Sequence, residues 1–207
     1  KRVLLTGHTG FKGGWLTLWL EKLGAKVTGF ALAPEPESIF LTAGIESSCE
    51  HRVGDVRVFA QVRDAVASVK PDIVFHAAAL KHVPLLERDW GEGIKTNVFG
   101  SVNVADAAAA SGASAMVMIS TDKAIEPVSV LGATKRFAEM YCQALDQQFA
   151  RKAEPGKSAM RLIAVRFGNV LASNGSVVPK FKAQIEAGGP VTVTHPDMVR
   201  YFMTIRE

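Results

Sequence analysis

A hydroxyl, a carboxylate and an amine stand side by side in the segment Ser120-Thr121-Asp122-Lys123. Such a set can hold a substrate hydroxyl and move protons to and from it. The segment follows the apolar run 115–119, which predicts a buried strand, and open α/β sheets bind ligands at the carboxyl ends of their strands. The same residue types also suit a polar strand-to-loop cap with an ion pair, so the residues alone favour neither interpretation.

A second segment, Thr6-Gly7-His8-Thr9-Gly10-Phe11-Lys12-Gly13, suits a phosphate-containing ligand. It follows the apolar run 3–6 and opens a helical pattern. Glycines there permit a tight turn, close approach of a pyrophosphate and close packing of helix on strand. The helix N-terminus then offers free N–H groups to the phosphate charge. The context favours a dinucleotide-binding turn over an ordinary strand-to-helix turn, with Gly7, Thr9, Gly10, Phe11 and Gly13 as the expected cofactor-binding residues.

The end of the second predicted strand decides which dinucleotide binds. An acidic residue there would hold the adenosine ribose of NAD. The segment 29–33 contains no carboxylate, and the next one is Glu35. The expected cofactor is therefore NADP or NAD, with no choice between them.

A third segment, 76–87, begins with a histidine and three alanines. Side chains as small as those of Ala77, Ala78 and Ala79 allow a cofactor to pass over the backbone. We expect His76 and His82 to be structural residues rather than metal ligands, because no third ligand accompanies them. The sequence predicts no metal site.

Strands alternate with helices along the chain. Apolar periodicity predicts helices over 15–23, 59–69, 96–111 and 132–149, and strands over 3–6, 26–32, 51–54, 72–76, 115–119, 162–167 and 191–194. In the first helix Trp15, Trp19 and Leu23 form an apolar face with Leu16 and Leu20 beside them, and Gly24 is expected to end the helix. The alternation predicts an α/β fold, a Rossmann-type doubly wound parallel sheet. We expect a dinucleotide-binding domain over 1–170 and the start of a small or truncated substrate-binding part over 171–207.

The composition narrows the function class. Hydrophobic residues make up 48% of the chain and charged residues 21%, as in soluble globular proteins. The net charge of +4 comes without a long basic run, so it suits an anionic small molecule at least as well as a nucleic acid. Only Cys49 and Cys142 are cysteines, and no apolar run is long enough to cross a bilayer. We expect a cytoplasmic protein with no membrane segment and no nucleic-acid partner.

The G-x-x-G-x-x-G spacing of the turn resembles the short-chain dehydrogenase/reductase superfamily, in its extended branch. That superfamily carries a Tyr-x-x-x-Lys pair on a helix, where the lysine lowers the pKa of the tyrosine and grips the nicotinamide ribose. In Leu131-Gly132-Ala133-Thr134-Lys135 the lysine keeps its place but leucine replaces the tyrosine. Leucine carries no proton, so either another group does that work or the site is inactive.

From about residue 71 onward the chain resembles the polysaccharide-biosynthesis type of UDP-N-acetylglucosamine 4,6-dehydratase. The matching pieces are HAAALKHVPLLE, TNVFGSVNV, ISTDKAIEPVSVLGATKRFAEM, RFGNVLASNGSVVPKF and GGPVTVTHPDMVRYFMT. Larger, membrane-tethered members of that family often have methionine in place of the tyrosine. The first stretch, VLLTGHTGFKGGWLTLWLEKLGAKVTGFAL, is more similar to CDP-glucose 4,6-dehydratase, so the chain reads as a mosaic.

The resemblance implies a lyase that uses its dinucleotide within one turnover. A hydride leaves carbon 4 of the hexose, the proton at carbon 5 is removed, the hydroxyl of carbon 6 departs as water, and the hydride returns to carbon 6. The implied catalytic roles are a hold on the carbon-4 hydroxyl for Thr121, the acid for Asp122 and the base for Lys123. Lys135 would orient the ribose, and Asn97 matches an active-site asparagine of the superfamily.

The resemblance also extends the list of binding residues. Asp55 and Val56 are expected near the adenine, although on residue type alone a solvated loop aspartate explains Asp55 as well. The expected substrate-binding residues are Lys81, His82, Arg166, Asn169, Ser176 and Arg200, with Arg200 as the preferred diphosphate clamp because its planar fork suits that ligand.

The implied partner is a UDP-sugar, or a CDP-sugar, bound by a homo-oligomer. A CDP-glucose 4,6-dehydratase, a UDP-sugar 4-epimerase and a nucleotide-binding protein without turnover remain as alternatives. Leu131 and the end of the chain at Glu207 motivate the last of these.

Overall fold

The computed structural model describes residues 1–156, 158–171, 173, 175–193 and 195–207. The chain divides into two compact units, Lys1–Arg166 and Phe167–Glu207. The expected division into a dinucleotide-binding domain over 1–170 and a substrate-binding part over 171–207 stays a prediction.

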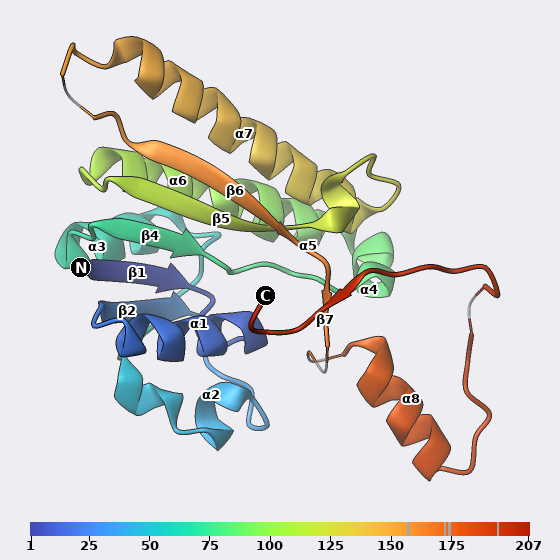
Figure 1. Ribbon diagram of the computed structural model, residues 1–207. Coiled ribbons are helices and arrows are strands. Elements are labelled where there is room, and N and C mark those ends of the chain that lie inside the picture. The colour runs from blue at the N-terminus through green and yellow to red at the C-terminus, as the bar shows by residue number, and fades with distance from the viewer. Residues whose placement is uncertain (157, 172, 174, 194) are drawn as a thin grey trace. The chain divides into compact units, whose positions relative to one another are not determined.

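The first unit is built on a six-stranded sheet (Figure 1). Its strands are β1 Arg2–Thr6, β2 Lys26–Ala31, β3 Glu50–Val53, β4 Ile73–His76, β5 Ala115–Thr121 and β6 Arg161–Phe167, in the order β3-β2-β1-β4-β5-β6. β1 pairs in parallel with β2 on one side and with β4 on the other, with Val3 opposite Val27 and Ile73. This strand order is that of dinucleotide-binding folds. The predicted Rossmann-type sheet is confirmed.

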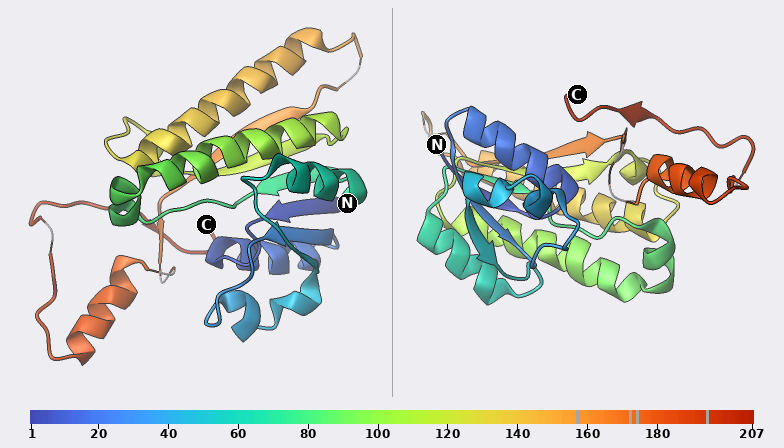
Figure 2. Two further views of the ribbon diagram at one scale, coloured as in Figure 1. Left: turned by 180° about the vertical axis from the view of Figure 1, so that it is seen from behind. Right: turned by 90° about the horizontal axis from the view of Figure 1, so that it is seen from below.

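Helices cover both faces of this sheet (Figure 2). Helices α3 Phe59–Val69, α6 Gly100–Ala110 and α7 Val130–Lys152 pack on one face, and α1 Phe11–Lys22 packs on the other. Side chains alternate along β1: Leu4 lies in the core beneath α3 and α6, while Leu5 packs with Leu20 of α1. Because helices cover both faces of the sheet, side chains on both sides of β1 are buried, and its sequence is a nearly continuous apolar run.

Helix α1 corrects one expectation from the sequence. Trp19 is 60% exposed and Leu23 69% exposed, so this part of the predicted apolar face points away from the sheet, whereas Leu16 and Leu20 beside it pack against the sheet. The buried positions are Gly13, Gly14, Thr17 and Leu20. The helix packs on the sheet with Leu20, and Trp19 lies on its outer side. Gly24 (φ +76°) ends the helix as expected.

Shorter helical segments connect the main elements. They are α2 Ile39–Thr42, a 3₁₀ turn at Ile45–Ser48, α4 Val83–Arg88, α5 Trp90–Gly93 and a 3₁₀ turn at Asp122–Ala124. Helix α6 follows directly on a π-helical turn, Ile94–Phe99, which buries Asn97 and Val98. Isolated π turns in proteins often lie at functional sites.

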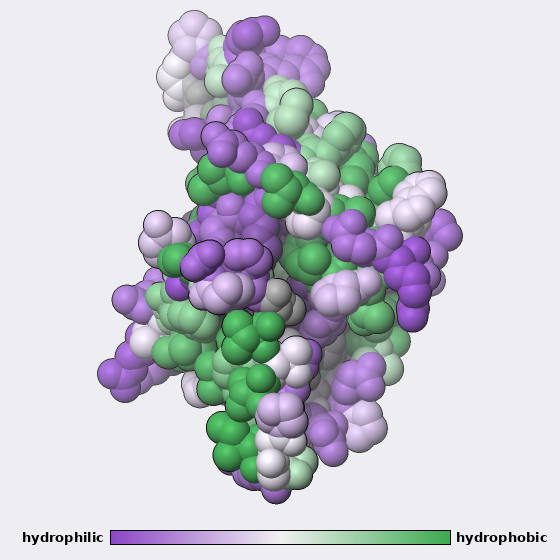
Figure 3. Space-filling model, turned by 90° about the vertical axis from the view of Figure 1, so that its right-hand side faces the viewer, coloured by the Kyte–Doolittle hydropathy of each residue, from purple (hydrophilic) through white to green (hydrophobic). Residues whose placement is uncertain are grey.

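The second unit contains strands β7 Asn169–Val170 and β8 Phe202–Met203, paired in parallel, and helix α8 Val177–Glu186. Figure 3 shows one face of the molecule, on which both apolar and polar side chains are exposed. The predicted strand at 191–194 is wrong over 191–193, and Thr194 lies outside the described residues. The backbone N–H of Thr192 donates to Gln184 Oε1 of α8 instead of entering a ladder.

Candidate functional site

The glycine turn lies at the carboxyl end of β1 and is shaped by backbone packing. Gly7 has φ +75°, a conformation that suits glycine, and a Cβ there would meet the backbone nitrogen of Ala78 at 2.5 Å. A Cβ on Gly13 would overlap the carbonyl oxygen of Gly7. The turn closes through Gly10 N donating to Gly7 O at 3.1 Å. Two of the predicted small-residue segments, 7–13 and 77–79, are therefore in direct contact.

A cavity of about 460 Å³ opens over this turn. Eight of the predicted cofactor residues line it: Gly7, Thr9, Gly10, Asp55, Val56, Ala77, Ala78 and Ala79. Phe11, Gly13 and Lys135 are not among its lining residues. The cavity also has lining residues that the sequence reasoning missed, namely Ala31, Leu32, Gly54, Arg57, Leu80, Glu92 and Thr96.

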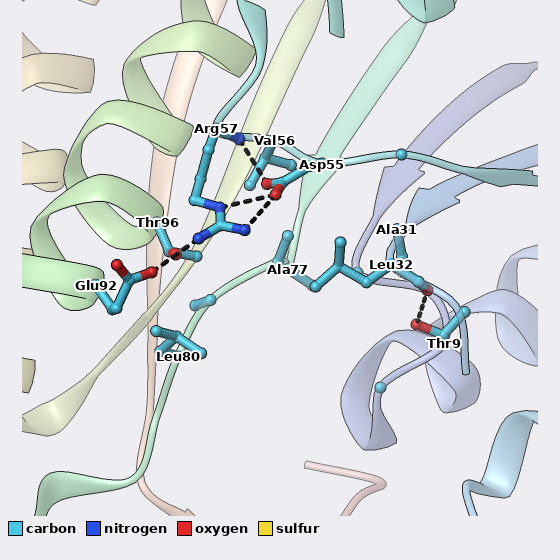
Figure 4. Close-up of a pocket in the computed structure, with 15 residues that line it drawn as sticks. Thr9, Ala31, Leu32, Asp55, Val56, Arg57, Ala77, Leu80, Glu92 and Thr96 are labelled. Carbon is cyan, nitrogen blue, oxygen red and sulfur yellow. Dashed lines mark hydrogen bonds and ion pairs between the residues drawn. The ribbon is translucent and has the colours of Figure 1, made fainter. Parts of the chain in front are cut away.

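An arginine bridges two carboxylates at one end of this cavity (Figure 4). Arg57 Nη2 lies 2.6 Å from Asp55 Oδ2, and Arg57 Nη1 donates to Glu92 Oε2 at 2.8 Å. The side-chain hydrogen bond from Arg57 lowers the pKa of Asp55, so this carboxylate is ionised near neutral pH. At the other end Thr9 Oγ1 donates to the carbonyl of Leu32, the residue after β2. Leu32 stands where an NAD-specific acid would be expected, as the sequence indicated.

Two buried histidines support the turn from below. His76 Nδ1 lies 2.7 Å from Thr6 Oγ1, and His76 Nε2 lies 2.9 Å from Ser101 Oγ. Burial lowers the pKa of His76 to about 3, so it is neutral and structural, as predicted. His8 Nε2 lies 2.6 Å from His51 Nδ1, and burial together with the charge of His51 lowers the pKa of His8 to about 4.

The segment at the carboxyl end of β5 forms a hydrogen-bonded set. Thr121 Oγ1 and Lys123 Nζ both donate to Asp122 Oδ1, each at 3.0 Å. Burial raises the pKa of Asp122, but the hydrogen bonds from Lys123 and Thr121 outweigh it and leave the pKa lowered. The structure thus contains the ion pair that the sequence allowed, and the acid–base role of the three groups stays a prediction.

Helix α7 brings Lys135 to this segment. Lys135 is buried, and its Nζ donates to the carbonyl of Ile119 in β5 at 2.8 Å. Burial first, and then the charge of Lys12, lower its pKa to about 8. Leu131, one turn earlier, is also buried, so the position of the superfamily's tyrosine holds an apolar side chain.

Asn97 links the two sides of the site. Its Oδ1 accepts from Leu80 N at 2.9 Å, and its Nδ2 donates to Leu80 O at 3.0 Å and to Thr134 Oγ1 at 3.2 Å. The π turn that carries Asn97 therefore fixes the loop after β4 against α7. In this structure Asn97 is held by backbone and hydroxyl groups, and its predicted active-site role remains a prediction.

Lysines gather at this edge of the sheet. Burial, followed by the charges of Lys81 and Lys123, lowers the pKa of Lys12 to about 8. Burial also lowers the pKa of Lys81, which lines a second cavity of about 270 Å³ together with His82. The sequence analysis missed Lys12, although its place inside the glycine turn could have indicated it.

The remaining predicted substrate residues lie at or beyond the end of β6. Arg166 Nη2 donates to Glu139 Oε2 of α7 at 2.6 Å. In the second unit Asn169 Nδ2 donates to Tyr201 O at 3.0 Å, Ser176 immediately precedes α8, and the exposed Arg200 donates from Nη1 to Val199 O at 2.9 Å. Their substrate contacts remain predictions.

Two further searches cover only the described part of the chain. No group of three or more His, Cys, Asp or Glu side chains is arranged to hold a metal ion there. None of its helices combines the length and apolarity that crossing a membrane requires.

Comparison with known proteins identifies relatives of the chain. It is 52% identical to the capsular polysaccharide biosynthesis protein CapD of Staphylococcus aureus over 75% of this chain and 24% of CapD. It is 41% identical to UDP-glucose 4-epimerase of Rickettsia typhi over 77% of this chain and 44% of that protein. It is 33% identical to CDP-glucose 4,6-dehydratase of Salmonella typhimurium over 100% of this chain and 64% of that enzyme.

A solved structure shows the same fold. Pen from Bacillus thuringiensis is 33% identical and superposes with a TM-score of 0.83, over 100% of this chain and 64% of Pen. In each of these comparisons the chain spans less than two-thirds of the relative's own length. Residues 30–207 match the family described as "Polysaccharide biosynthesis protein", as the motifs after residue 71 predicted. The chain therefore belongs to the polysaccharide biosynthesis protein family.

Proposed function

We propose that this chain forms the dinucleotide-binding and catalytic part of a nucleotide-sugar 4,6-dehydratase, with UDP-N-acetylglucosamine as substrate. The observation that carries the proposal is the hydrogen-bonded set Thr121, Asp122 and Lys123, which lies at the end of β5 with Lys135 bonded to the same strand. A family relative, the Salmonella enzyme, is named as a dehydratase of this kind.

The turn and the cavity fit NADP or NAD. A Cβ on Gly7 or Gly13 would fill the space against the backbone that the turn requires, and α1 has no acidic residue in its first turn to repel a phosphate. The residues that would hold the dinucleotide are Gly7, Thr9, Gly10, Asp55 and Ala77–Ala79, with Lys135 on the ribose of the nicotinamide. When bound, the dinucleotide supplies hydride acceptance at carbon 4 and hydride return at carbon 6.

The chain's own residues would move the protons. Thr121 Oγ1 contacts the carbon-4 hydroxyl and donates to Asp122 Oδ1 at 3.0 Å, which gives the proton of that hydroxyl a path to Asp122. Asp122 then passes the proton to the departing hydroxyl of carbon 6, which leaves as water. Lys123 takes the proton of carbon 5 and returns it, so the net change is the loss of one water. This route needs no tyrosine, which accommodates the buried Leu131.

Lys123 must enter the reaction as a neutral amine to act as a base. In the structure its Nζ is ion-paired with Asp122 at 3.0 Å. The proton of Nζ must pass to solvent before carbon 5 is attacked, because Asp122 has to stay ionised to receive the proton of the carbon-4 hydroxyl.

The test is product analysis. The protein is incubated with UDP-N-acetylglucosamine and either NADP or NAD, and the product is examined by mass spectrometry. We expect a 4-keto-6-deoxy sugar nucleotide that has lost the mass of water. The absence of product from every UDP- or CDP-hexose tried would reject the proposal.

Two other enzyme activities have specific support. The N-terminal stretch and the Salmonella relative favour CDP-glucose as the substrate, and the Rickettsia relative favours 4-epimerisation. CDP-glucose gives the same loss of water from a different nucleotide. Epimerisation keeps the mass of the substrate, so chromatographic separation of the two epimers is needed to detect it.

A further inference from the structure

We propose that Glu139, a buried carboxylate on α7, is the positioning residue that holds the Thr121-Asp122-Lys123 segment and Lys135 in place, with Arg166 as its counter-ion. This inference rests on the proposed function. It also gives Arg166 a role different from the substrate contact that the sequence indicated.

Both carboxylate oxygens of Glu139 accept hydrogen bonds. The residue is 1% exposed. Its Oε1 accepts from Ser120 Oγ at 2.6 Å and from Arg166 Nε at 2.8 Å. Its Oε2 accepts from Arg166 Nη2 at 2.6 Å and from Arg136 Nη1 at 3.2 Å. A buried carboxylate persists only when its lone pairs are satisfied in this way, so the arrangement fixes the end of β5 against α7 and β6.

Glu139 and Lys135 act on consecutive residues of β5. Lys135 donates to the carbonyl of Ile119, and Glu139 accepts from the hydroxyl of Ser120, the residue before Thr121. Positions four apart share a helix face. Lys135 and Glu139 therefore hold the end of β5 against one turn of α7 through two hydrogen bonds, one to Ile119 and one to Ser120. Thr121 directly follows Ser120 and Lys123 lies two residues further on, so fixing Ser120 also fixes the position of these two residues.

The charge of Glu139 also acts on Lys135. The titratable groups that face Lys135 are Lys12 of α1, His76 of β4, and Glu139 and Cys142 of α7. Lys12 disfavours the charged form of Lys135, whereas the negative charge of Glu139 favours it. Removing the charge of Glu139 would therefore lower the pKa of Lys135 below its value of about 8.

The chain contains a matched control on the same two elements. Asp146 Oδ1, two turns further along α7, accepts from Arg161 Nε at 3.0 Å and from Leu162 N at 2.8 Å at the start of β6. This carboxylate joins α7 to β6 as Glu139 does, but at the end of the strand remote from Thr121. Asp146→Asn should cost stability without affecting the site.

The experiment compares Glu139→Gln with Asp146→Asn in the whole chain. NADH affinity is measured by fluorescence from pH 6 to pH 10, turnover of UDP-N-acetylglucosamine is measured over the same range, and folding is checked by circular dichroism. Charged Lys135 favours NADH binding, so affinity falls as the pH rises through its pKa. We expect Glu139→Gln to move this fall toward lower pH by up to about one pH unit and to lower kcat more than it raises KM. We expect Asp146→Asn to leave the midpoint unchanged.

A folded Glu139→Gln variant with the wild-type midpoint and wild-type kcat would overturn the inference. So would an equal shift in Asp146→Asn. If Glu139→Gln does not fold, Ser120→Ala is used instead, because it removes only the hydrogen bond between Ser120 and Glu139. A kcat about tenfold lower with unchanged NADH affinity supports the positioning role. A wild-type kcat contradicts it. If the wild type binds NADH but turns over no sugar nucleotide, the proposed function fails, while the NADH titration still tests Glu139.

Discussion

The two halves of the candidate site are built in different ways. The half at the ends of β1 and β4 is made of backbone and small side chains, with Gly7 packed on Ala78 and neutral His8 and His76 beneath it. The half at the end of β5 contains charged side chains, with Lys123 bonded to Asp122 and Glu139 bonded to Ser120. The first half should respond to added volume and to acid, and the second to removed charge and to alkali.

The largest expected effect is in the charged half. Lys123→Met removes the proposed base and one partner of Asp122. We expect turnover to fall by about 10²–10⁴-fold, the range for loss of a general acid or base, with NADH affinity nearly unchanged. Steady-state kinetics and an NADH titration on one preparation give both numbers. Equal losses in the two measurements would mean that the halves are not separate.

The next largest effect is expected in the backbone half, and it falls on NADH affinity rather than on turnover. Gly13→Ala places a Cβ on the carbonyl oxygen of Gly7, so the turn must shift. A shift of this size can cost on the order of 100-fold in NADH affinity. Gly112→Ala, at an open positive-φ position after α6, controls for backbone strain alone. If both variants bind NADH equally, the close approach of Gly13 to Gly7 does not matter for the site.

The third prediction concerns acid. On folding, the pKa of His8 falls from about 6.5 to about 4 and that of His76 to about 3. Just below pH 6.5 these histidines are therefore protonated in the unfolded chain but neutral in the folded chain. Their stabilisation is complete above about pH 6.5 and is lost as the pH falls toward 4. Between pH 6.5 and 5 the free energy of unfolding should fall by up to about 1.4 kcal/mol per pH unit for each histidine. Urea unfolding measured at several pH values checks the slope, and His76→Gln should reduce it by about half.

The smallest effect is expected at the rim of the cavity. Asp55→Asn keeps an acceptor but removes a charge that Arg57 already neutralises in part. We expect NADH affinity to fall by about threefold to tenfold, the scale of one hydrogen bond. Isothermal titration calorimetry can resolve this change. A loss as large as that of Gly13→Ala would place Asp55 at the centre of the cofactor contact.

The sequence predicted the main elements of the first unit because apolar runs and glycines mark its buried strands and turns. The prediction for α1 was wrong for Trp19 and Leu23 because periodicity counts apolar side chains, whereas the buried positions of this helix are Gly13, Gly14, Thr17 and Leu20. In the second unit, residues 191–193 have alternating apolar and polar side chains, but among the described residues they pair with no strand. Glu139 was missed because its importance depends on Arg166 and Ser120, which are distant in sequence and meet it only in the fold.

The position of β1 has a consequence for how the protein folds. β1 pairs with β2 nearby in the chain, but its other neighbour is β4, whose residues lie 70 positions further along. Contacts of such long separation close slowly, because the intervening chain must first lose its freedom. Gly7 takes its shape against Ala77 and Ala78, which follow β4. The glycine turn therefore cannot be complete before β4 has docked, and substitutions in β4 should delay the recovery of NADH binding during refolding.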